Sequence, residues 1–460
     1  MKNALCRLLP AILLAALPAA VSAETSVDAT TIVRVQQEAQ SPSLGGKTFV
    51  PITQFLGADF DKLGDGNLSV HLLGWGQLDF TDDRRTVDDK ERRTQGSLTY
   101  GYLQYRFNQA NARARAGRFF VNEGIVNEQV DGVSFRTDLP YGFGVSAFGG
   151  APVHTVDIPG AGTDGKGDGI FGGRVNYRLG GKLELGISGV YESRVPELRN
   201  NPAPTVPLGF PAGSFGELGS FGSHRQVGAD VYFSPINMLQ LSGHSTYNTE
   251  TKKLAEHTYL LQVTPIKNLT LAGSYDYHRD RDYFYSSILF SDMLRTIGQE
   301  SRVLGASATY AYRQLELSGD FKDYQRDIGK AERFGGELRG YFADNTVRSG
   351  LSYHYLRASS DFAIVPIATA SGSFHEARAW AMRDTKSYFA AIDLIDYIFR
   401  KPVEGKDNAW EATGSLGYHL TPAFALSGDV SYGQNPQFDD EVKGLIRLTY
   451  NMTTGKGATK

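Results

Sequence analysis

The chain alternates hydrophobic and polar residues with a period of two over most of its length after residue 67. Leu183, Leu185 and Ile187 share one side of an extended segment, and Glu184 and Ser188 share the other. Side chains of a β-strand point alternately to the two faces of a sheet, so this pattern predicts strands with one apolar and one polar face. Equivalent segments begin at Leu68, Leu239, Leu269, Leu315, Phe334, Phe424 and Val442.

The connections between these segments alternate in length. Short links fall at 108–111, 179–182, 234–237, 264–268, 343–345 and 421–423, and longer polar segments fall at 81–96, 151–168, 193–222, 280–298 and 359–407. Short turns at one end and long loops at the other are typical of a membrane barrel and distinguish it from a soluble β-sandwich, whose strands also alternate. We therefore predict an all-β fold, a transmembrane antiparallel β-barrel of about 18 strands (about 16 to 20), with short periplasmic turns and long extracellular loops.

Two segments do not fit this pattern. Residues 24–65 are polar, and we expect them to form a periplasmic lead-in before a barrel at 66–460. This lead-in is too short for the plug of a siderophore-type transporter, whose barrel has about 22 strands. Phe389, Ile392, Ile395 and Phe399 follow helical spacing, which predicts a helical loop insert near 374–399. If 374–383 and 386–398 form a hairpin instead, the strand count becomes about 20.

The first 23 residues have the pattern of a cleaved secretory signal peptide. Lys2 and Arg7 precede an apolar run from Leu8 to Ala20, and the tripeptide Val21-Ser22-Ala23 follows it. The run is about 13 residues long, whereas a membrane-spanning helix needs roughly 20. We therefore exclude residues 1–23 from the fold and expect the mature chain to be exported.

Removal of the signal changes the composition that bears on function. It takes away Cys6 and two basic residues, so the mature chain has no cysteine and a net charge of −5. Thiolate-bound metal, covalent c-type haem and a cysteine nucleophile are thereby excluded. The near-neutral charge gives no footprint for nucleic acid. No stretch of 18 apolar residues follows Ala23, so a membrane-spanning form of this chain has to be a closed barrel.

Residues 112–135, ARARAGRFFVNEGIVNEQVDGVSF, carry a more specific likeness. Alternating arginines followed by a Gly-Arg pair before a loop resemble the early strand pair of porins, in which a basic ladder faces the lumen. The rest of the chain resembles porin-like bacterial outer-membrane β-barrel proteins through its alternation alone. The resemblance implies an integral protein of the outer membrane of a Gram-negative bacterium. The chain departs from the usual porin end, because Ala458-Thr459-Lys460 stands where a terminal aromatic residue is expected.

The polar faces of the predicted strands place charged side chains inside the barrel. The pore-lining basic set is Arg113, Arg115, Arg136, Arg174 and Arg178. The pore-lining acidic set, expected roughly across the barrel from it, is Asp230, Glu256, Asp276, Glu316 and Asp320. Opposed sets would create a transverse field at a constriction, which favours small hydrophilic solutes over apolar ones. Alternatively, these charges only solvate a wet interior.

No motif predicts an enzyme, a cofactor or a metal site. The segment GAGTDGK at 160–166 nearly matches a phosphate-binding loop, but Gly167 stands where a Ser or Thr should hold magnesium. The nine histidines show no paired zinc spacing. An outer-membrane lipase triad would leave no fixed spacing, and no nucleophile motif supports one.

Two functions of different classes fit these observations. The first is a porin-like channel in outer-membrane lipid for passive diffusion of small hydrophilic solutes or ions, with a homotrimer as a plausible assembly. The second is a barrel sleeve that holds a multihaem cytochrome as an electron conduit, since a lumen of about 18 to 20 strands is wide enough to admit a partner. Ion conduction by the purified barrel would support the first, and stoichiometric co-purification with a haem protein would support the second.

Overall fold

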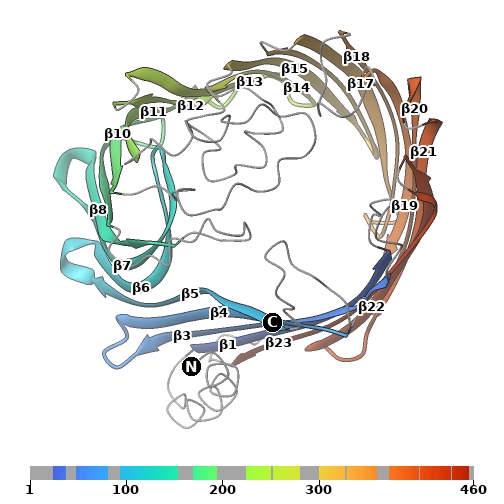
Figure 1. Cartoon of the computed structure of the whole chain (residues 1–460). Coiled ribbons are helices and arrows are strands. Elements are labelled where there is room, and N and C mark those ends of the chain that lie inside the picture. The colour runs from blue at the N-terminus through green and yellow to red at the C-terminus, as the bar shows by residue number, and fades with distance from the viewer. Residues whose placement is uncertain are drawn as a thin grey trace, which may run out of the picture.

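The chain forms one closed ring of antiparallel β-strands (Figure 1). The structure, a computed structural model, describes residues 24–37, 48–80, 94–153, 169–193, 224–249, 252–279, 300–326, 329–359, 372–403, 405–436 and 438–454. The ring closes because β1 pairs with β3 on one side and with β23 on the other, from Thr25 opposite Thr454 to Val35 opposite Gly444. No helix within the described residues is long and apolar enough to cross a membrane.

The strands follow the chain around the ring, each one pairing with the next. Their bounds are β1 (Glu24–Gln37), β2 (Thr48–Phe49), β3 (Pro51–Leu63), β4 (Leu68–Asp79), β5 (Thr94–Phe107), β6 (Ala112–Glu123), β7 (Val126–Asp138), β8 (Phe143–Pro152), β9 (Ile170–Leu179), β10 (Leu183–Glu192), β11 (His224–Ile236), β12 (Leu239–Asn248), β13 (Lys253–Ile266), β14 (Leu269–Arg279), β15 (Glu300–Tyr312), β16 (Leu315–Arg326), β17 (Gly329–Phe342), β18 (Val347–Ala358), β19 (Phe374–Asp384), β20 (Tyr388–Val403), β21 (Lys406–His419), β22 (Phe424–Asn435) and β23 (Phe438–Thr454). Two single turns of 3-10 helix, η2 (Asn108–Ala110) and η3 (Pro140–Gly142), complete the described elements.

The closed antiparallel barrel is confirmed, but the predicted strand count of 18 is wrong. The described part of the chain places 22 strands around the ring, because the two-residue β2 is separated from β3 by Val50 alone and pairs with the same strand, β1. Two of the additional strands come from each segment that the sequence analysis assigned differently, 24–65 and 374–399. The signal peptide at 1–23 lies outside the described residues.

Residues 24–65, expected as a periplasmic lead-in, instead supply β1 and β3. The register with β23 shows which side chains of β1 point outward. Val27 lies opposite Met452 and Val33 lies opposite Ile446, both on the apolar outer face of β23. Between these valines the same face carries Ala29 and Thr31, and Thr31 donates a hydrogen bond to Gln54 of β3. Small and polar residues on the outward face weaken the period-two signal, which is why the segment reads as polar.

Residues 374–399, expected as a helical insert, form the hairpin β19–β20, the alternative that the sequence had left open. Apolar residues occupy both faces of β20, because Ile392 and Leu394 point outward while Phe389 and Ile395 point inward. β19 presents only alanines on its outward face at mid-strand. Because β20 has apolar residues on both faces, their spacing matches that of a helix as well as that of a strand.

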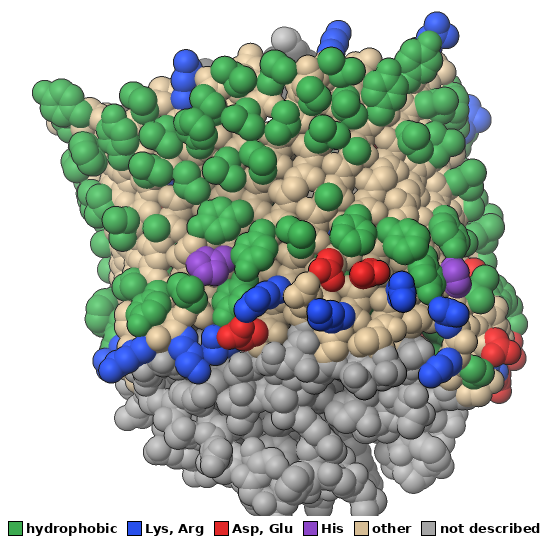
Figure 2. Space-filling model, turned by 90° about the horizontal axis from the view of Figure 1, so that it is seen from above, with side chains coloured by type: hydrophobic (Ala, Val, Ile, Leu, Met, Phe, Trp, Pro, Cys, Tyr) green, Lys and Arg blue, Asp and Glu red, His purple; other side chains and the backbone are tan. Residues whose placement is uncertain are grey.

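The two faces of the ring differ in chemistry as a membrane barrel requires. Most large side chains exposed on the outside are apolar, among them Ile187, Leu351, Val430 and Ile446. Figure 2 views the wall over β13 to β18 and shows hydrophobic side chains spread across it, with charged and histidine side chains gathered in a belt towards one end. That end carries the long connections, and aromatic pairs such as Phe143–Tyr177 and Phe424–Tyr450 mark the end with the short turns.

The outward face tolerates charge poorly if it lies in lipid. We expect Leu351→Arg, which places a guanidinium on the outer face in the middle of β18, to lower the free energy of unfolding by about 2–4 kcal/mol. Ser352→Arg is the matched control, since residue 352 points inward between Glu337 and Arg378. Urea titration of the folded barrel in lipid vesicles measures both, and equal destabilisation by the two changes would contradict the assigned faces.

Candidate functional site: an inward-folded hairpin and its ion pairs

The hairpin β6–β7 leaves the wall half-way along its length. β6 pairs with β5 only from Ala112 to Arg118, and β7 pairs with β8 only from Val130 to Asp138. Beyond those points β6 and β7 pair with each other alone, up to the turn at Gly124 and Ile125. In Figure 1 the hairpin runs on the lumen side of β8 to β10, on the left of the ring.

A pair of glycines sits where the hairpin departs. Gly117 and Gly132 face each other across β6 and β7. Gly117 has a φ of 128°, which L side chains rarely adopt, and a Cβ at position 132 would overlap the carbonyl oxygen of Gly149. Glycine is thus required at both positions, once for backbone conformation and once for close approach of neighbouring strands.

The polarity of the two faces of β6 inverts at this glycine pair, while the alternation itself continues through it. In the wall part of β6, the alanines at 114 and 116 face outward and Arg113 and Arg115 face inward. In the free part the face that carries the arginines continues with Phe119 and Val121, while the opposite face carries Asn122 and the exposed ring of Phe120. A hairpin that lies inside the ring needs an apolar face toward the wall on which it packs. Its opposite face, toward the lumen, has to be largely polar.

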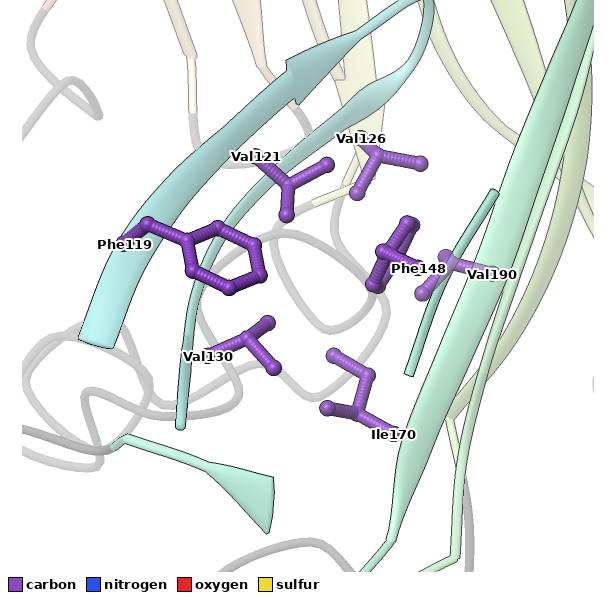
Figure 3. Close-up of a cluster of buried hydrophobic side chains, with 7 residues drawn as sticks. All are labelled: Phe119, Val121, Val126, Val130, Phe148, Ile170 and Val190. Carbon is purple, nitrogen blue, oxygen red and sulfur yellow. The ribbon is translucent and has the colours of Figure 1, made fainter. Parts of the chain in front are cut away.

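That dry contact is the hydrophobic core of the protein (Figure 3). Phe119, Val121, Val126 and Val130 of the hairpin point toward side chains on the inward faces of β8, β9 and β10, namely Phe148, Ile170 and Val190. All seven are buried, and Val130 has no exposed surface. The hairpin and the wall behind it therefore form a filled lobe at one side of the ring.

The tip of the hairpin is docked on β10 and β11. The backbone N–H of Ile125 donates a hydrogen bond to Oγ of Ser188 at 3.1 Å. Gly124, with a φ of 66°, lies so close to Ser188 and Asp230 that a Cβ there would overlap Oγ of Ser188. A Cβ at Gly228 would lie 2.6 Å from Cγ2 of Ile125, so both sides of the contact depend on missing side chains.

Ion pairs surround the docked tip. Glu123, next to the turn, accepts a hydrogen bond from Arg136 at 3.1 Å and lies 3.9 Å from Nη2 of Arg113. Both arginines are near the other end of the hairpin, so these contacts show how strongly it curls.

A second group of ion pairs lies on the wall beneath the tip. Arg174 of β9, nearly buried, forms ion pairs with Asp230 of β11 and with Glu184 of β10, the latter at 2.9 Å. Arg178 bonds the same Glu184 through Nε at 2.9 Å and lies 3.8 Å from Asp138. Charge-assisted bonds of this kind hold three adjacent strands in register under the hairpin.

The structure separates the predicted site residues into two groups. Arg113, Arg136, Arg174 and Arg178 gather at the lobe, and Arg115 bonds Gln104 at 2.9 Å beside the ring of Tyr102. Asp230, expected across the barrel from the arginines, is instead a direct partner of Arg174. The prediction that acidic residues lie across the barrel from the basic ones is therefore wrong for Arg174 and Asp230.

The other predicted acidic residues lie on β13 to β16, and three of them have charged partners nearby. Glu256 is 3.2 Å from Nε2 of His244, and Glu316 is 3.4 Å from Nη1 of Arg339. Asp320 is 3.0 Å from both Arg333 and His354. Asp276 faces inward opposite Thr258. The charges of Glu256, Glu316 and Asp320 are thus balanced by neighbouring side chains.

Sequence reasoning missed Glu123, Glu184 and the apolar inward face of the hairpin. The signal for the last was present, since Phe119 and Val121 fall on the same face as Arg113 and Arg115 when the alternation is continued through Gly117. The GAGTDGK segment at 160–166 lies outside the described residues. In the part of the chain that is described, no group of three or more His, Cys, Asp or Glu side chains is arranged to hold a metal ion.

Comparisons with known proteins bear on the fold. No protein-family model matches the sequence, and no curated protein matches it. Among solved structures, a mutant ferric enterobactin receptor (PfeA) of Pseudomonas aeruginosa aligns with 94% of this chain and 81% of its own, at 11% identity and a TM-score of 0.57. Another mutant of this receptor, in complex with enterobactin, aligns with 94% of this chain and 82% of its own, at 12% identity and a TM-score of 0.56. OccAB4 of Acinetobacter baumannii covers 94% and 99%, at 11% identity and a TM-score of 0.45.

The chain has the fold of an outer-membrane β-barrel. The expected likeness to barrels of this kind is confirmed at the level of the fold. At identities of 10–12% it carries no substrate with it.

The dry core should hold the hairpin in place independently of the rest of the ring. We expect Phe119→Ala to cost about 3–5 kcal/mol of local stability, because it removes a fully buried ring from the centre of the cluster. Hydrogen exchange of the peptide at 119–130 should accelerate accordingly, while the heat-modifiable gel mobility of the barrel is retained. Phe120→Ala is the control, since the ring of Phe120 is 42% exposed on the other side of the same strand. Equal exchange in both variants would show that the cluster does not anchor the hairpin.

Proposed function

We propose that this protein is an outer-membrane channel whose wide lumen admits small hydrophilic solutes or ions by passive diffusion. The observation that carries the proposal is the contrast between the two faces of a closed ring, apolar outside and lined inside by ion pairs from β9 to β23. Lipid satisfies only the first face and water only the second. The described strands between residues 24 and 454 thereby enclose a polar interior within an apolar outer face.

The width of the ring supports a channel that needs internal narrowing. Barrels of 22 strands have a lumen that other outer-membrane transporters fill with a plug. In this chain the longest stretch between consecutive described strands, residues 193–223, has 31 residues. Within the described residues, the β6–β7 hairpin is the segment that enters the ring and occupies part of its cross-section.

The charge distribution supports selection by size and polarity. Inward-facing arginines are matched by carboxylates on the same or neighbouring strands, as at Arg333, Arg339 and Arg378. Paired charges cancel at distances beyond about 10 Å in salt, so the field in the open lumen is weak. The interior still disfavours apolar solutes, because entry would displace water from ionised groups.

Planar-bilayer recording tests the proposal directly. Purified barrel should conduct ions without any added partner. Deletion of 118–131, with Gly117 and Gly132 joined through an Asn-Gly turn, should raise single-channel conductance, since the two glycines already face each other across the hairpin. Retained heat-modifiable mobility shows that the shortened ring is folded.

Two outcomes would contradict the channel. Absence of conduction by a folded barrel excludes passive flow through the ring. A haem protein that co-purifies in stoichiometric amount and abolishes conductance would favour the sleeve for an electron conduit instead.

A further inference from the structure

The outer wall over β16 to β21 contains an apolar groove with a volume of about 790 Å³. Small residues form its floor. Ala379 of β19 lies in register between Leu351 of β18 and Leu394 of β20, and Ala377 lies in the next outward-facing row. The missing side-chain volume between two rows of leucines leaves a trench on a face that otherwise presents large apolar side chains.

A connected set of aromatic and basic side chains rises from this groove toward the end with the long connections. Tyr353 lines the groove, and its hydroxyl is 2.6 Å from Nδ1 of His375. His375 stacks on Tyr355, with ring centroids 4.5 Å apart. The hydroxyl of Tyr355 in turn accepts a hydrogen bond from Nη1 of Arg400 at 3.2 Å. The order from apolar floor through aromatic rings to a cation is that of a lipid from its tail to its headgroup.

Two arginines flank one residue at the outer end of this set. Ser373 accepts a hydrogen bond from the backbone N–H of Arg400 at 3.0 Å, and its Oγ accepts one from the N–H of Ala358, the neighbour of Arg357. Arg357 and Arg400 are therefore about 10 Å apart at the backbone, two inter-strand spacings, and point to the same side. Both are exposed, and neither lies within ion-pair distance of a described carboxylate, although Glu332 of β17 lies directly opposite Arg357 in register.

A carboxylate on the same face lacks a strong donor. Asp396 lies in the row of Ala377, at the edge of the groove, and faces outward. Its recorded partner is Nδ2 of Asn408, at a long distance of 3.5 Å. A carboxylate that faces lipid is costly without donors, so a hydroxyl or amide group of a bound molecule is the partner that this position favours.

We propose that the groove and the side chains above it bind one phosphorylated glycolipid of the outer leaflet. An acyl chain lies over Ala377 and Ala379, a phosphate sits between Arg357 and Arg400, and a hydroxyl or amide near the head of the chain donates to Asp396. A second copy of this chain fits less well, since it would bury two guanidinium groups that have no carboxylate within ion-pair distance, whereas an anionic lipid neutralises them. The inference rests on the membrane location proposed above and is independent of ion conduction.

Native mass spectrometry of the refolded full-length barrel, titrated with diphosphorylated lipid A, tests this site. We expect one tightly bound lipid. The double variant Arg357→Gln with Arg400→Gln should bind it about tenfold more weakly, through loss of charge-assisted hydrogen bonds. The same loss is expected when the unchanged barrel is titrated with the dephosphorylated lipid. Arg225→Gln is the matched control, because Arg225 lies 5.0 Å above the ring of Tyr191 on the opposite part of the outer wall and should not matter.

Ala379→Phe separates the groove from the arginines. It fills the trench from the lipid side without burying a new group, so the barrel should fold and lose affinity for both forms of the lipid. Undiminished binding in the double variant, equal binding of the dephosphorylated lipid, or an oligomer without lipid that disappears in Ala379→Phe would each overturn the proposal. The last result would identify a second copy of the chain as the occupant.

Discussion

The structure depends on one constraint, that the backbone N–H and C=O groups of an apolar wall cannot remain unpaired. A sheet meets this requirement only when its first and last strands pair, and here β1 and β23 do so over eleven registered positions. Closure explains why β1 and β3 belong to the ring although their outward faces contain alanine, threonine and glutamine. Backbone pairing, rather than side-chain hydrophobicity, fixes their place, and polar residues such as Thr31 and Gln54 are tolerated because they bond each other.

The same constraint governs the one place where the wall is interrupted. Where β6 and β7 leave their neighbours, side chains take over part of the lost ladder, since Arg118 donates to the carbonyl of Leu98 and Gln129 donates to that of Thr99. The inversion of polarity at Gly117 and Gly132 follows directly, because a hairpin inside the ring has water where its former outward face met lipid. The backbone pairing and the burial of the hairpin side chains thus both favour a position of residues 119–129 inside the ring.

The sequence predicts those strands whose two faces differ clearly in hydrophobicity. β10, β16 and β22 have large apolar residues on one face and polar ones on the other, and all three were predicted. The turns before β10 and β22, at 179–182 and 421–423, were predicted with them. β19 and β20 were not, since Ala377 and Ala379 provide little apolar contrast and Asp396 stands on the lipid side. The arginines of the lobe were identified as inward-facing, but their partners were not, because the partner of Arg174 depends on which strands are neighbours and on the curl of the hairpin. Period-two alternation predicts which face of the sheet a side chain occupies, but it does not predict how the strands curve around the ring. Asp230 was therefore placed across the ring from Arg174, although the two side chains are in contact.

The magnitude of the dry core decides whether the hairpin can act as a gate. Undocking it would expose Phe119, Val121, Val126 and Val130, each worth about 1.5–3 kcal/mol of transfer free energy, or on the order of 8 kcal/mol together. Even with a reduction for compactness of the undocked state, an opening that costs several kcal/mol populates fewer than about one molecule in a thousand. The contacts at the tip, one hydrogen bond from Ile125 and the ion pairs of Glu123, add to this cost. A solute or a change in ionic strength acts only on the ion pairs, which are the smaller part. Among the described residues the hairpin is therefore a fixed partition that separates a filled lobe from the rest of the ring, and a movement that opens or closes the interior would have to arise elsewhere than in β6 and β7.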